Sequence, residues 1–220
     1  MLSRILLFFL FFGGIFAYVL YQFLTSFPPG RKRREEEFKN LKAEIADWFP
    51  ELIAWNKDEL EMLSLNQINN KKSGTLRPTG KGIFTSVYSE PMIAYAYKQL
   101  QGKKGQSLVY AKTANHEYGL NMKSRETDIW MDGIPLGSLK STGAFIDPNG
   151  QEIARIKKSN DQKSLPVFIK DREIASLIHP DQLKDVNPRT FELVQQMSKE
   201  EEAVIVALAI NQMVKSEIRQ

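Results

Sequence analysis

The chain lacks cysteine altogether and contains only two histidines in 220 residues. The absence of cysteine excludes disulfides, thiolate catalysis, zinc–thiolate sites and lipid attachment to a cysteine. A strong charge imbalance is also missing, since 30 Lys and Arg residues face 26 Asp and Glu residues, for a net charge of +4. Nucleic-acid binding usually depends on a clustered basic face, so we expect no nucleic-acid partner.

Histidine chemistry has little support as well. His116 is followed by Glu117, and His179 precedes Pro180 and Asp181, but neither pair has a third metal ligand or a nucleophile near it in the sequence. Both contexts are typical of turns, so we interpret the histidines as surface residues and predict no catalytic centre, metal site or cofactor. Only a deep pocket that joins one of them to carboxylates would favour an enzyme.

Three further patterns are explained by turns. Gly102–Gly105 and Thr79–Gly82 are basic, glycine-containing segments without the spacing of a phosphate-binding loop, so we expect exposed hairpin tips. Asp147, Asn149 and Asp161 lack the twelve-residue alternation of a calcium loop, and turn formation is the simpler interpretation.

One long apolar run lies at the N-terminus. No charged residue occurs from Ile5 to Phe27. At ~1.5 Å per residue this run gives roughly 34 Å of helix, enough to cross a hydrocarbon core of about 30 Å. A cleaved signal peptide is the alternative, but its apolar core is usually shorter, and Ser26–Pro29 is a poor cleavage site. We therefore predict that residues 1–30 form a single transmembrane anchor.

Basic residues follow this run directly. Arg31–Arg34 carries four positive charges, against Arg4 and the terminal amine on the other side, so the positive-inside rule places the main domain in the cytoplasm. These cations and those of a predicted hairpin tip are candidates for contact with anionic lipid headgroups. The candidates are Arg31, Lys32, Arg33, Arg34, Lys103 and Lys104.

Residues 31–73 are expected to form an amphipathic helical stalk. Apolar positions from Phe38 to Leu52 recur at steps of three and four with a break at Pro50, and a second short helix is predicted from Asp58 to Ile68. Aromatic residues here either enter the membrane interface or cap the next domain. We favour capping, because hydrophobic stripes at helical spacing usually face a core. These aromatic residues are Trp48, Phe49 and Trp55.

Residues 74–220 are predicted to form a mainly β, antiparallel, barrel-like domain. Three hairpins succeed one another, with turns at Asp132–Gly133, Asp147–Gly150 and Lys170–Arg172. Each returning strand repeats an aliphatic residue after three positions, which implies a β-bulge near the small residue between, or burial on both faces. Either suits a curved barrel. The pairs are Leu136 and Leu139, Ile153 and Ile156, and Ile174 and Leu177.

A closing helix is predicted over residues 198–216. Ser198 and Glu201 match a capping box, and an unbroken apolar run follows from Ala203 to Ile210. That run is far shorter than the ~20 residues that span a bilayer, so the helix is expected to be buried in protein. The preceding strands can enclose it as a barrel.

Serial hairpins followed by an apolar C-terminal helix resemble the tubby-like superfamily, which includes tubby C-terminal domains, phospholipid scramblases and LURP-one-related proteins. The resemblance is carried by Trp130–Lys140, Ala144–Ile156, Val167–Ile178 and Ser198–Val214. It implies a barrel around a central helix, with membrane links through phosphoinositide binding or lipid movement. The chain lacks the cysteine-rich tract and proline-rich tail of scramblases, and its basic residues do not match the phosphoinositide-binding residues of tubby.

Together these features favour a membrane-tethered, non-catalytic binding or scaffolding domain. Its expected partners are membrane lipids, through the N-terminal helix and through anionic headgroups, or an unknown protein. Scramblase-like lipid transport, which rests on the family resemblance alone, is the alternative. An enzyme of unknown type is the third hypothesis.

Overall fold

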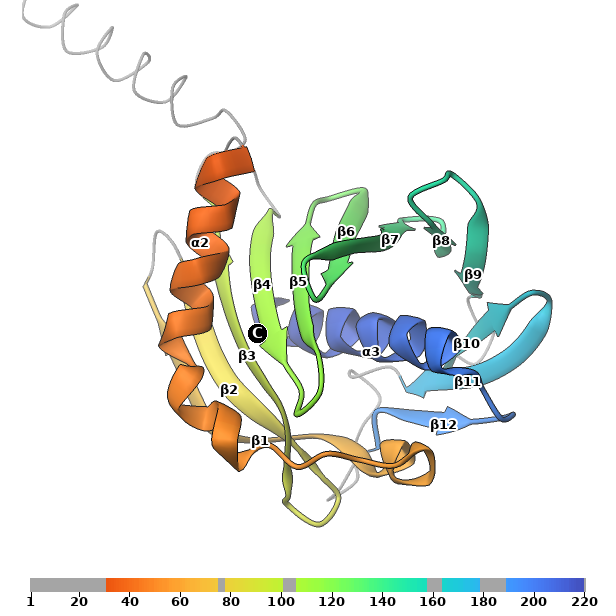
Figure 1. Ribbon diagram of the computed structural model, residues 1–220, viewed down its shortest axis with the longest axis horizontal. Helices are drawn as coiled ribbons and strands as arrows, with labels where there is room; N and C mark the ends of the chain where they lie inside the picture. Colours follow the sequence, from red (N-terminus) through yellow and green to blue (C-terminus); the bar gives the residue numbers. More distant parts are fainter. Residues whose placement is uncertain (1–30, 75–77, 101–105, 158–163, 179–188, 220) are drawn as a thin grey trace, which may run out of the picture.

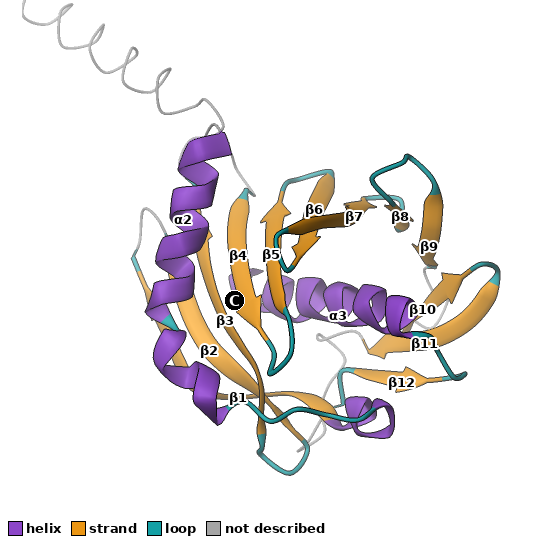
Figure 2. Ribbon diagram, viewed as in Figure 1, coloured by secondary structure: helices purple, strands orange, loops and turns teal. Residues whose placement is uncertain are grey.

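The computed structural model describes residues 31–74, 78–100, 106–157, 164–178 and 189–219. The described strands form one sheet in which each strand pairs with the next along the chain (Figures 1 and 2), which confirms a mainly β, antiparallel fold. The helices are α2 (Arg31–Glu44), the 3₁₀ helices η1 (Ala46–Glu51) and η2 (Lys57–Met62), and α3 (Lys199–Arg219). The strands are β1 (Leu63–Ser73), β2 (Thr79–Ser86), β3 (Pro91–Gln99), β4 (Ser107–Lys112), β5 (Glu117–Met122), β6 (Glu126–Met131), β7 (Ile134–Lys140), β8 (Ala144–Ile146), β9 (Glu152–Ile156), β10 (Ser164–Ile169), β11 (Arg172–Ile178) and β12 (Phe191–Leu193).

The sheet curls until its two ends nearly meet. Ser64 of β1 forms a β-bridge with Arg189, and the N–H of Thr190 donates to the carbonyl of Leu63 at 2.8 Å. Because Arg189 and Thr190 directly precede β12, these contacts join the first strand to the last. The result is a nearly closed barrel through which α3 runs (Figure 1).

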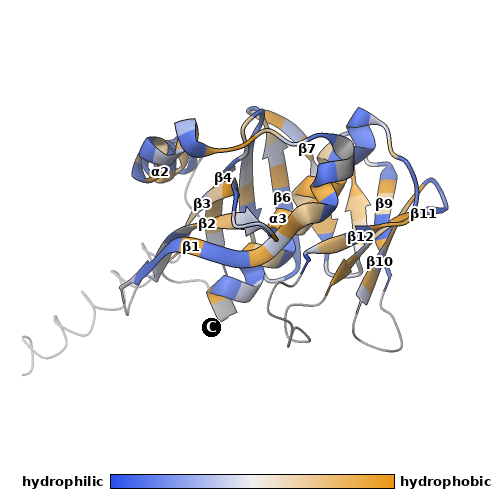
Figure 3. Ribbon diagram, turned by 90° about the horizontal axis from the view of Figure 1, so that it is seen from below, coloured by the Kyte–Doolittle hydropathy of each residue, from blue (hydrophilic) through white to orange (hydrophobic). Residues whose placement is uncertain are grey.

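α3 is buried in the middle of the barrel, as its apolar run predicts. Val204–Ile210, Met213 and Val214 are each at most 5% exposed and belong to one core cluster with residues of the surrounding strands. Each fully buried aliphatic side chain contributes roughly 1.5–3 kcal/mol, so the helix and the barrel stabilise each other. In Figure 3 the apolar stretch of α3 lies among the strands.

Both ends of α3 are fixed by polar contacts. The predicted capping box is present, since the N–H of Glu201 donates to the hydroxyl of Ser198 at 3.2 Å and the N–H of Ser198 donates to the Glu201 carboxylate at 2.8 Å. At the other end the Lys72 ammonium of β1 lies 3.2 Å from the Glu217 carboxylate. The helix ends at Arg219, three residues past the predicted end at residue 216.

The three predicted hairpins are confirmed as β6–β7, β8–β9 and β10–β11. Each returning strand carries one extra residue at a shift in register, and the extra residues are Leu136, Ile153 and Ile174. The three-residue aliphatic spacing predicts these bulges, because one inserted residue lets two side chains three positions apart point to the same face of the sheet. Ile174 and Leu177 are both fully buried as a consequence.

α2 and η1, within the segment predicted as an amphipathic helical stalk, cover the outer face of the sheet. A second hydrophobic cluster joins them to β2–β4, and its members are Leu41, Ile45, Leu52, Ile83, Ala94, Ala96, Leu108 and Tyr110. Trp48 and Phe49 pack against this cluster and Trp55 against the barrel core, which confirms the capping interpretation of these aromatics. Strands β3 and β4 are therefore buried on both faces.

The predicted helix over residues 58–68 is wrong beyond Met62. The chain makes the short helix η2 and then enters β1 at Leu63, and β1 pairs with β2 as far as Ser73. Leu60 and Leu63 are fully buried at helical spacing, but cross-strand pairing outweighs so short a pattern. The predicted domain boundary at residue 73 consequently falls at the end of a strand that belongs to the barrel.

The prediction that Thr79–Gly82 is a hairpin tip is wrong, because these residues lie within β2. The aromatic rings of β3 cover the two glycines, and a Cβ at Gly80 would overlap the Tyr97 ring. Glycine is needed here because a strand backbone must lie directly against an aromatic ring. The Lys81 ammonium donates to the carbonyl of Glu44 at 2.9 Å, which ties β2 to the end of α2.

Asp147 forms the predicted turn. Its carboxylate accepts the N–H of Asn149 at 2.9 Å and the N–H of Gln151 at 2.7 Å, so its oxygen atoms serve the hairpin backbone. Asp161, the third residue of the rejected calcium pattern, lies outside the described residues.

None of the helices formed by the described residues has the length and apolar content to cross a membrane. The run from Ile5 to Phe27, for which the sequence predicts an anchor, lies outside the described residues.

Candidate functional site

A groove of about 620 Å³ runs between α2 and the outer face of the sheet, and we call it the α2 groove. Its volume falls in the range of small-molecule sites. From α2 the groove is lined by Arg34, Glu35, Phe38, Lys39 and Lys42, and from the sheet and its β6–β7 turn by Tyr110, Glu117, Tyr118, Gly119, Trp130, Gly133 and Pro135. Aromatic and charged side chains therefore share one concave surface.

The floor of the α2 groove is one row of residues across strands β4 to β7. Tyr110 pairs with Gly119, Gly119 with Trp130, and Trp130 with Pro135. Because Gly119 has no side chain, the row has a depression at this position. The Phe38 ring lies over the depression, 3.5 Å from where a Cβ at Gly119 would be. Phe38 also meets Trp130 edge to face, with ring centroids 6.1 Å apart. The floor is therefore largely aromatic.

The α2 side of the groove carries three basic residues, Arg34, Lys39 and Lys42, and one acidic residue, Glu35. Arg34, Phe38 and Lys42 recur every four residues and so lie on one face of the helix. The Lys42 ammonium is 2.7 Å from the Glu117 carboxylate, which holds the helix against β5. Neither Arg34 nor Lys39 forms an ion pair within the described part of the chain. These two cations are available to an anionic ligand.

A buried phenol completes the groove. Tyr110 is 5% exposed, and its hydroxyl makes no hydrogen bond of ordinary geometry with a described residue, although the Glu117 carboxylate lies close enough to affect its pKa. Burial and the nearby Glu117 carboxylate raise the pKa of Tyr110, so the hydroxyl stays protonated. An unpartnered buried hydroxyl costs about 1–3 kcal/mol. A ligand that accepts or donates a hydrogen bond here removes that cost.

The predicted lipid contacts are only partly placed at this groove. Arg34 lines it, while Lys32 and Arg33 are exposed on the first turn of α2 and do not. The side chain of Arg31 and the whole of Lys103 and Lys104 lie outside the described residues. Sequence reasoning missed Tyr110, Gly119 and Trp130, because the pairing that puts them in one row is set by strand register.

Beside the floor, the same face of the sheet carries a charged network. The Lys123 ammonium lies 2.8 Å from Glu126 and 2.8 Å from Asp128, and the Lys140 ammonium lies 2.6 Å from Glu126. Hydrogen bonds from Lys123 and then Lys140 lower the pKa of Glu126 from 4.5 to about 2. A carboxyl whose pKa is lowered by folding contributes stability above its unfolded pKa, so this contribution is lost as the pH falls from about 4.5 toward 2.

Replacing Lys140 by methionine is expected to raise the pKa of Glu126 from about 2 toward 4.5, because one of its two cationic donors is removed. The carboxyl ¹³C shift of Glu126, followed against pH in the full chain, measures this change. Lys170→Met, on the exposed β10–β11 turn, is the control and should leave the titration where it is. An unchanged titration in K140M would show that Lys140 is not a partner in solution.

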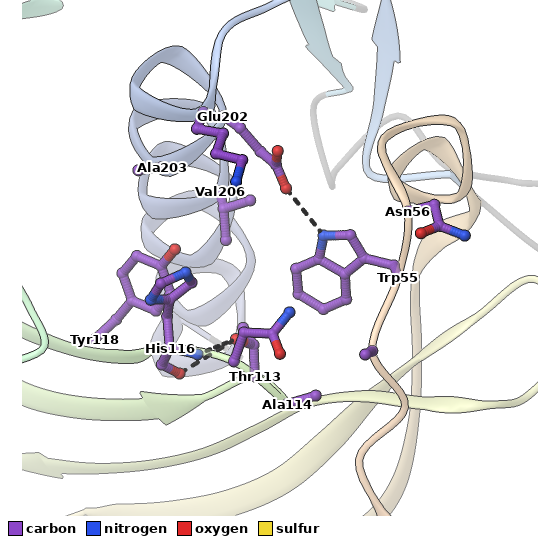
Figure 4. Close-up of a pocket in the computed structure, with 12 residues that line it drawn as sticks. Trp55, Asn56, Thr113, Ala114, His116, Tyr118, Glu202, Ala203 and Val206 are labelled. Carbon is purple, nitrogen blue, oxygen red and sulfur yellow. Dashed lines mark hydrogen bonds between the residues drawn. The ribbon is translucent and has the colours of Figure 1, made fainter.

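A second cavity, of about 320 Å³, opens at the N-terminal end of α3, and we call it the mouth pocket (Figure 4). Its walls come from the segment before η2, the β4–β5 turn and the first turns of α3. Trp55, His116, Tyr118 and Glu202 supply its polar and aromatic groups. The indole N–H of Trp55 donates to the Glu202 carboxylate at 3.3 Å.

His116 of the mouth pocket is paired with the carboxylate of Asp132, which does not itself line the pocket. The imidazole Nδ1 of His116 lies 2.7 Å from Asp132, and both side chains are nearly half exposed. The nearby hydroxyl of Thr113 is hydrogen-bonded to the backbone of His116 and not to its ring. The His116 ring is thus hydrogen-bonded to a carboxylate, but the nearby Thr113 hydroxyl does not bond to that ring. In the described ranges no group of three metal-ligating residues occurs. His179 lies outside those ranges.

The fold and these two cavities define the chain as a nearly closed β-barrel around a C-terminal helix, with ligand-sized cavities on its outer face and at its mouth. Comparison of the chain with protein-family models, with curated proteins and with solved structures finds no match.

Proposed function

We propose that the protein is a membrane-tethered, non-catalytic binding domain that takes up an anionic lipid headgroup in the α2 groove. The main support is that one groove combines Arg34 and Lys39, which form no ion pair with a described residue, with the buried hydroxyl of Tyr110, which makes no hydrogen bond of ordinary geometry in the described structure. Cations attract phosphate or carboxylate oxygens, and the phenol supplies a directed hydrogen bond.

The aromatic floor suits the apolar part of the same ligand. Phe38 and Trp130 form an apolar surface next to the cations, so an amphiphile can place its headgroup on the cations and the start of its chain on the rings. A free inorganic ion would leave these rings unused. We therefore favour a lipid over a simple anion.

The position of α2 supports a membrane role. α2 begins at Arg31, directly after the segment for which the sequence predicts the anchor. At ~1.5 Å per residue, Arg34 lies only about 5 Å along the helix from its start. If residues 1–30 span the bilayer, one end of the α2 groove faces the headgroup layer. Access of an added protease to the barrel in native membranes tests the predicted cytoplasmic placement.

The resemblance to the tubby-like superfamily belongs to this proposal. A nearly closed antiparallel barrel with a C-terminal helix inside agrees with the architecture that the resemblance implies. Scramblase-like transport has no support beyond that resemblance. If the full chain does not move lipids between the leaflets of a liposome, this alternative is wrong.

Anionic short-chain lipid is expected to shift the indole N–H signal of Trp130, because Trp130 forms the groove floor. The full chain in neutral detergent micelles is titrated with dihexanoyl phosphatidylglycerol, and its three tryptophan indole signals are followed by NMR. Arg34→Gln with Lys39→Gln should weaken binding by about 10- to 30-fold, at about 1 kcal/mol for each charge.

The matched control is Arg125→Gln with Lys170→Gln, which removes two exposed cations elsewhere on the barrel and should change the affinity less than twofold. Gly119→Leu fills the floor beneath Phe38 and should also abolish the Trp130 shift, whereas Gly119→Ala fits at ordinary contact distance and should not. Equal loss of affinity in both charge-removal pairs would mean nonspecific attraction and would overturn the proposal.

A further inference from the structure

The mouth pocket contains a carboxylate that is poor in hydrogen-bond donors. Glu202 is half-buried in the first turn of α3, and the one hydrogen bond that its carboxylate accepts from a described residue is the 3.3 Å bond from the Trp55 indole. A carboxylate accepts about four hydrogen bonds. Figure 4 shows Glu202 and the Trp55 indole meeting at one side of the pocket. The negative charge of Glu202 therefore lies on the wall of a cavity, and no cation among the described residues forms an ion pair with it.

Aromatic and aliphatic side chains face Glu202 across part of the mouth pocket, and its remaining lining is polar or basic, from Asn56, Thr113, Asn115, His116 and Lys199. The indole of Trp55 stands opposite Val206 and Ala203 of α3, and Tyr118 comes from β5 (Figure 4). The phenol of Tyr118 is almost fully buried, and burial together with the charges of Asp132 and Glu202 raises its pKa, so it remains neutral. Aromatic faces beside a carboxylate attract cations more than anions.

We propose that the mouth pocket binds an organic ammonium group, with Glu202 as the counterion and with Trp55 and Tyr118 as the aromatic walls. A methylated ammonium suits this lining because its methyl groups are apolar while its charge is diffuse. The cavity, at about 320 Å³, has room for a choline-sized group with a short substituent. The ammonium group can belong to a small free molecule or to a lipid headgroup.

Lys199 allows a test of whether the mouth pocket prefers a cationic or an anionic ligand. It lines the same pocket, is exposed, and forms no ion pair with Glu202 in the described structure. Its positive charge therefore opposes a cationic ligand and would assist an anionic one. The two charges of the pocket predict opposite effects when each is removed.

The experiment titrates the full chain in neutral detergent micelles with choline chloride and follows the indole N–H signal of Trp55. The neutral isostere 3,3-dimethyl-1-butanol, which has the same shape without the charge, is the ligand control. Glu202→Gln keeps an oxygen for the Trp55 hydrogen bond and should weaken choline binding by about tenfold, whereas Lys199→Gln should strengthen it by about threefold. Glu200→Gln, an exposed carboxylate of the same helix turn, should change it less than twofold.

The signal of Trp48, which packs in the outer core, should not move and serves as an internal reference. Dihexanoyl phosphatidylcholine at equal concentration distinguishes the sources, since tighter binding than choline would indicate a lipid headgroup and weaker binding a free molecule. Equal shifts with the neutral isostere, or an unchanged affinity in E202Q, would overturn the proposal. Because the reporter is Trp55 and not Trp130, this outcome is independent of the one for the α2 groove.

Discussion

Leu208→Ala is expected to lower the free energy of unfolding by about 2–5 kcal/mol, because it opens a cavity at the centre of the barrel. Leu208 is fully buried on α3 and belongs to the core cluster shared with the strands. The surrounding sheet is held by backbone pairing on both sides of each strand, so it has little freedom to collapse into the space. Urea unfolding of the full chain in neutral micelles, followed by circular dichroism, measures the loss.

Ile134→Ala is the control for that experiment. It removes a similar aliphatic side chain from the start of β7, where Ile134 is 70% exposed. The expected change is within about 0.5 kcal/mol, as for most surface substitutions. If both variants lose the same stability, α3 is not enclosed by the barrel in solution.

Gly143→Ala is expected to cost about 2–5 kcal/mol, the sum of conformational strain and overlap. Gly143 has a φ of +89°, and an added Cβ would overlap the carbonyl oxygen of Ile156. A left-handed conformation costs a non-glycine residue roughly 1–2 kcal/mol, and overpacking adds about 1–3 kcal/mol. The Gly143 carbonyl also accepts the N–H of Ile156 at 2.8 Å, so the backbone cannot move away without losing that bond.

Gly150→Ala separates the two causes. Gly150 has nearly the same φ, +84°, but no atom lies within 4 Å of the position of an added Cβ. Its substitution should therefore cost only the conformational part, about 1–2 kcal/mol. Thermal unfolding of the two variants side by side measures the difference, and equal losses would mean that the overlap at Gly143 is relieved.

These two glycines also show which backbone requirements can be predicted from local sequence and which cannot. Gly150 ends an Asp-Pro-Asn-Gly turn, and the sequence predicts its role because a tight turn needs a positive φ at that position. Gly143 has no such motif around it. Its requirement arises because β9 passes directly beside the turn between β7 and β8, and the position of β9 is set by pairing along the whole sheet.

The same distinction applies to the hairpins, the bulges and the closing helix. Asp-Gly turns, the repeated aliphatic spacing and the Ser198–Glu201 capping box are local signals, and the predictions drawn from them are confirmed. The prediction of a helix over residues 58–68 was wrong beyond Met62. An amphipathic pattern of that length is compatible with either a helix or a strand, and pairing with β2 decides for the strand.

The candidate sites depended almost entirely on tertiary structure. Sequence reasoning predicts Arg34 as a candidate lipid contact, from a basic cluster next to an apolar run, and the structure places Arg34 at the α2 groove. It did not identify Tyr110 and Trp130, which share the α2 groove because β4, β5 and β6 are in a particular register. Nor did it join Trp55 to Glu202, which are separated by most of the chain and meet at the barrel mouth.

The sequence by itself determined the class of this protein: a mainly β, antiparallel domain with an apolar closing helix, because turn residues, caps and periodicity act over a few neighbouring residues. Tertiary structure alone decided which strands α2 covers, that Thr79–Gly82 is strand, and that two ligand-sized cavities exist. The physical reason is that a cavity is formed by side chains from distant segments. Their meeting is fixed by the register of the whole sheet and by the helix that fills it.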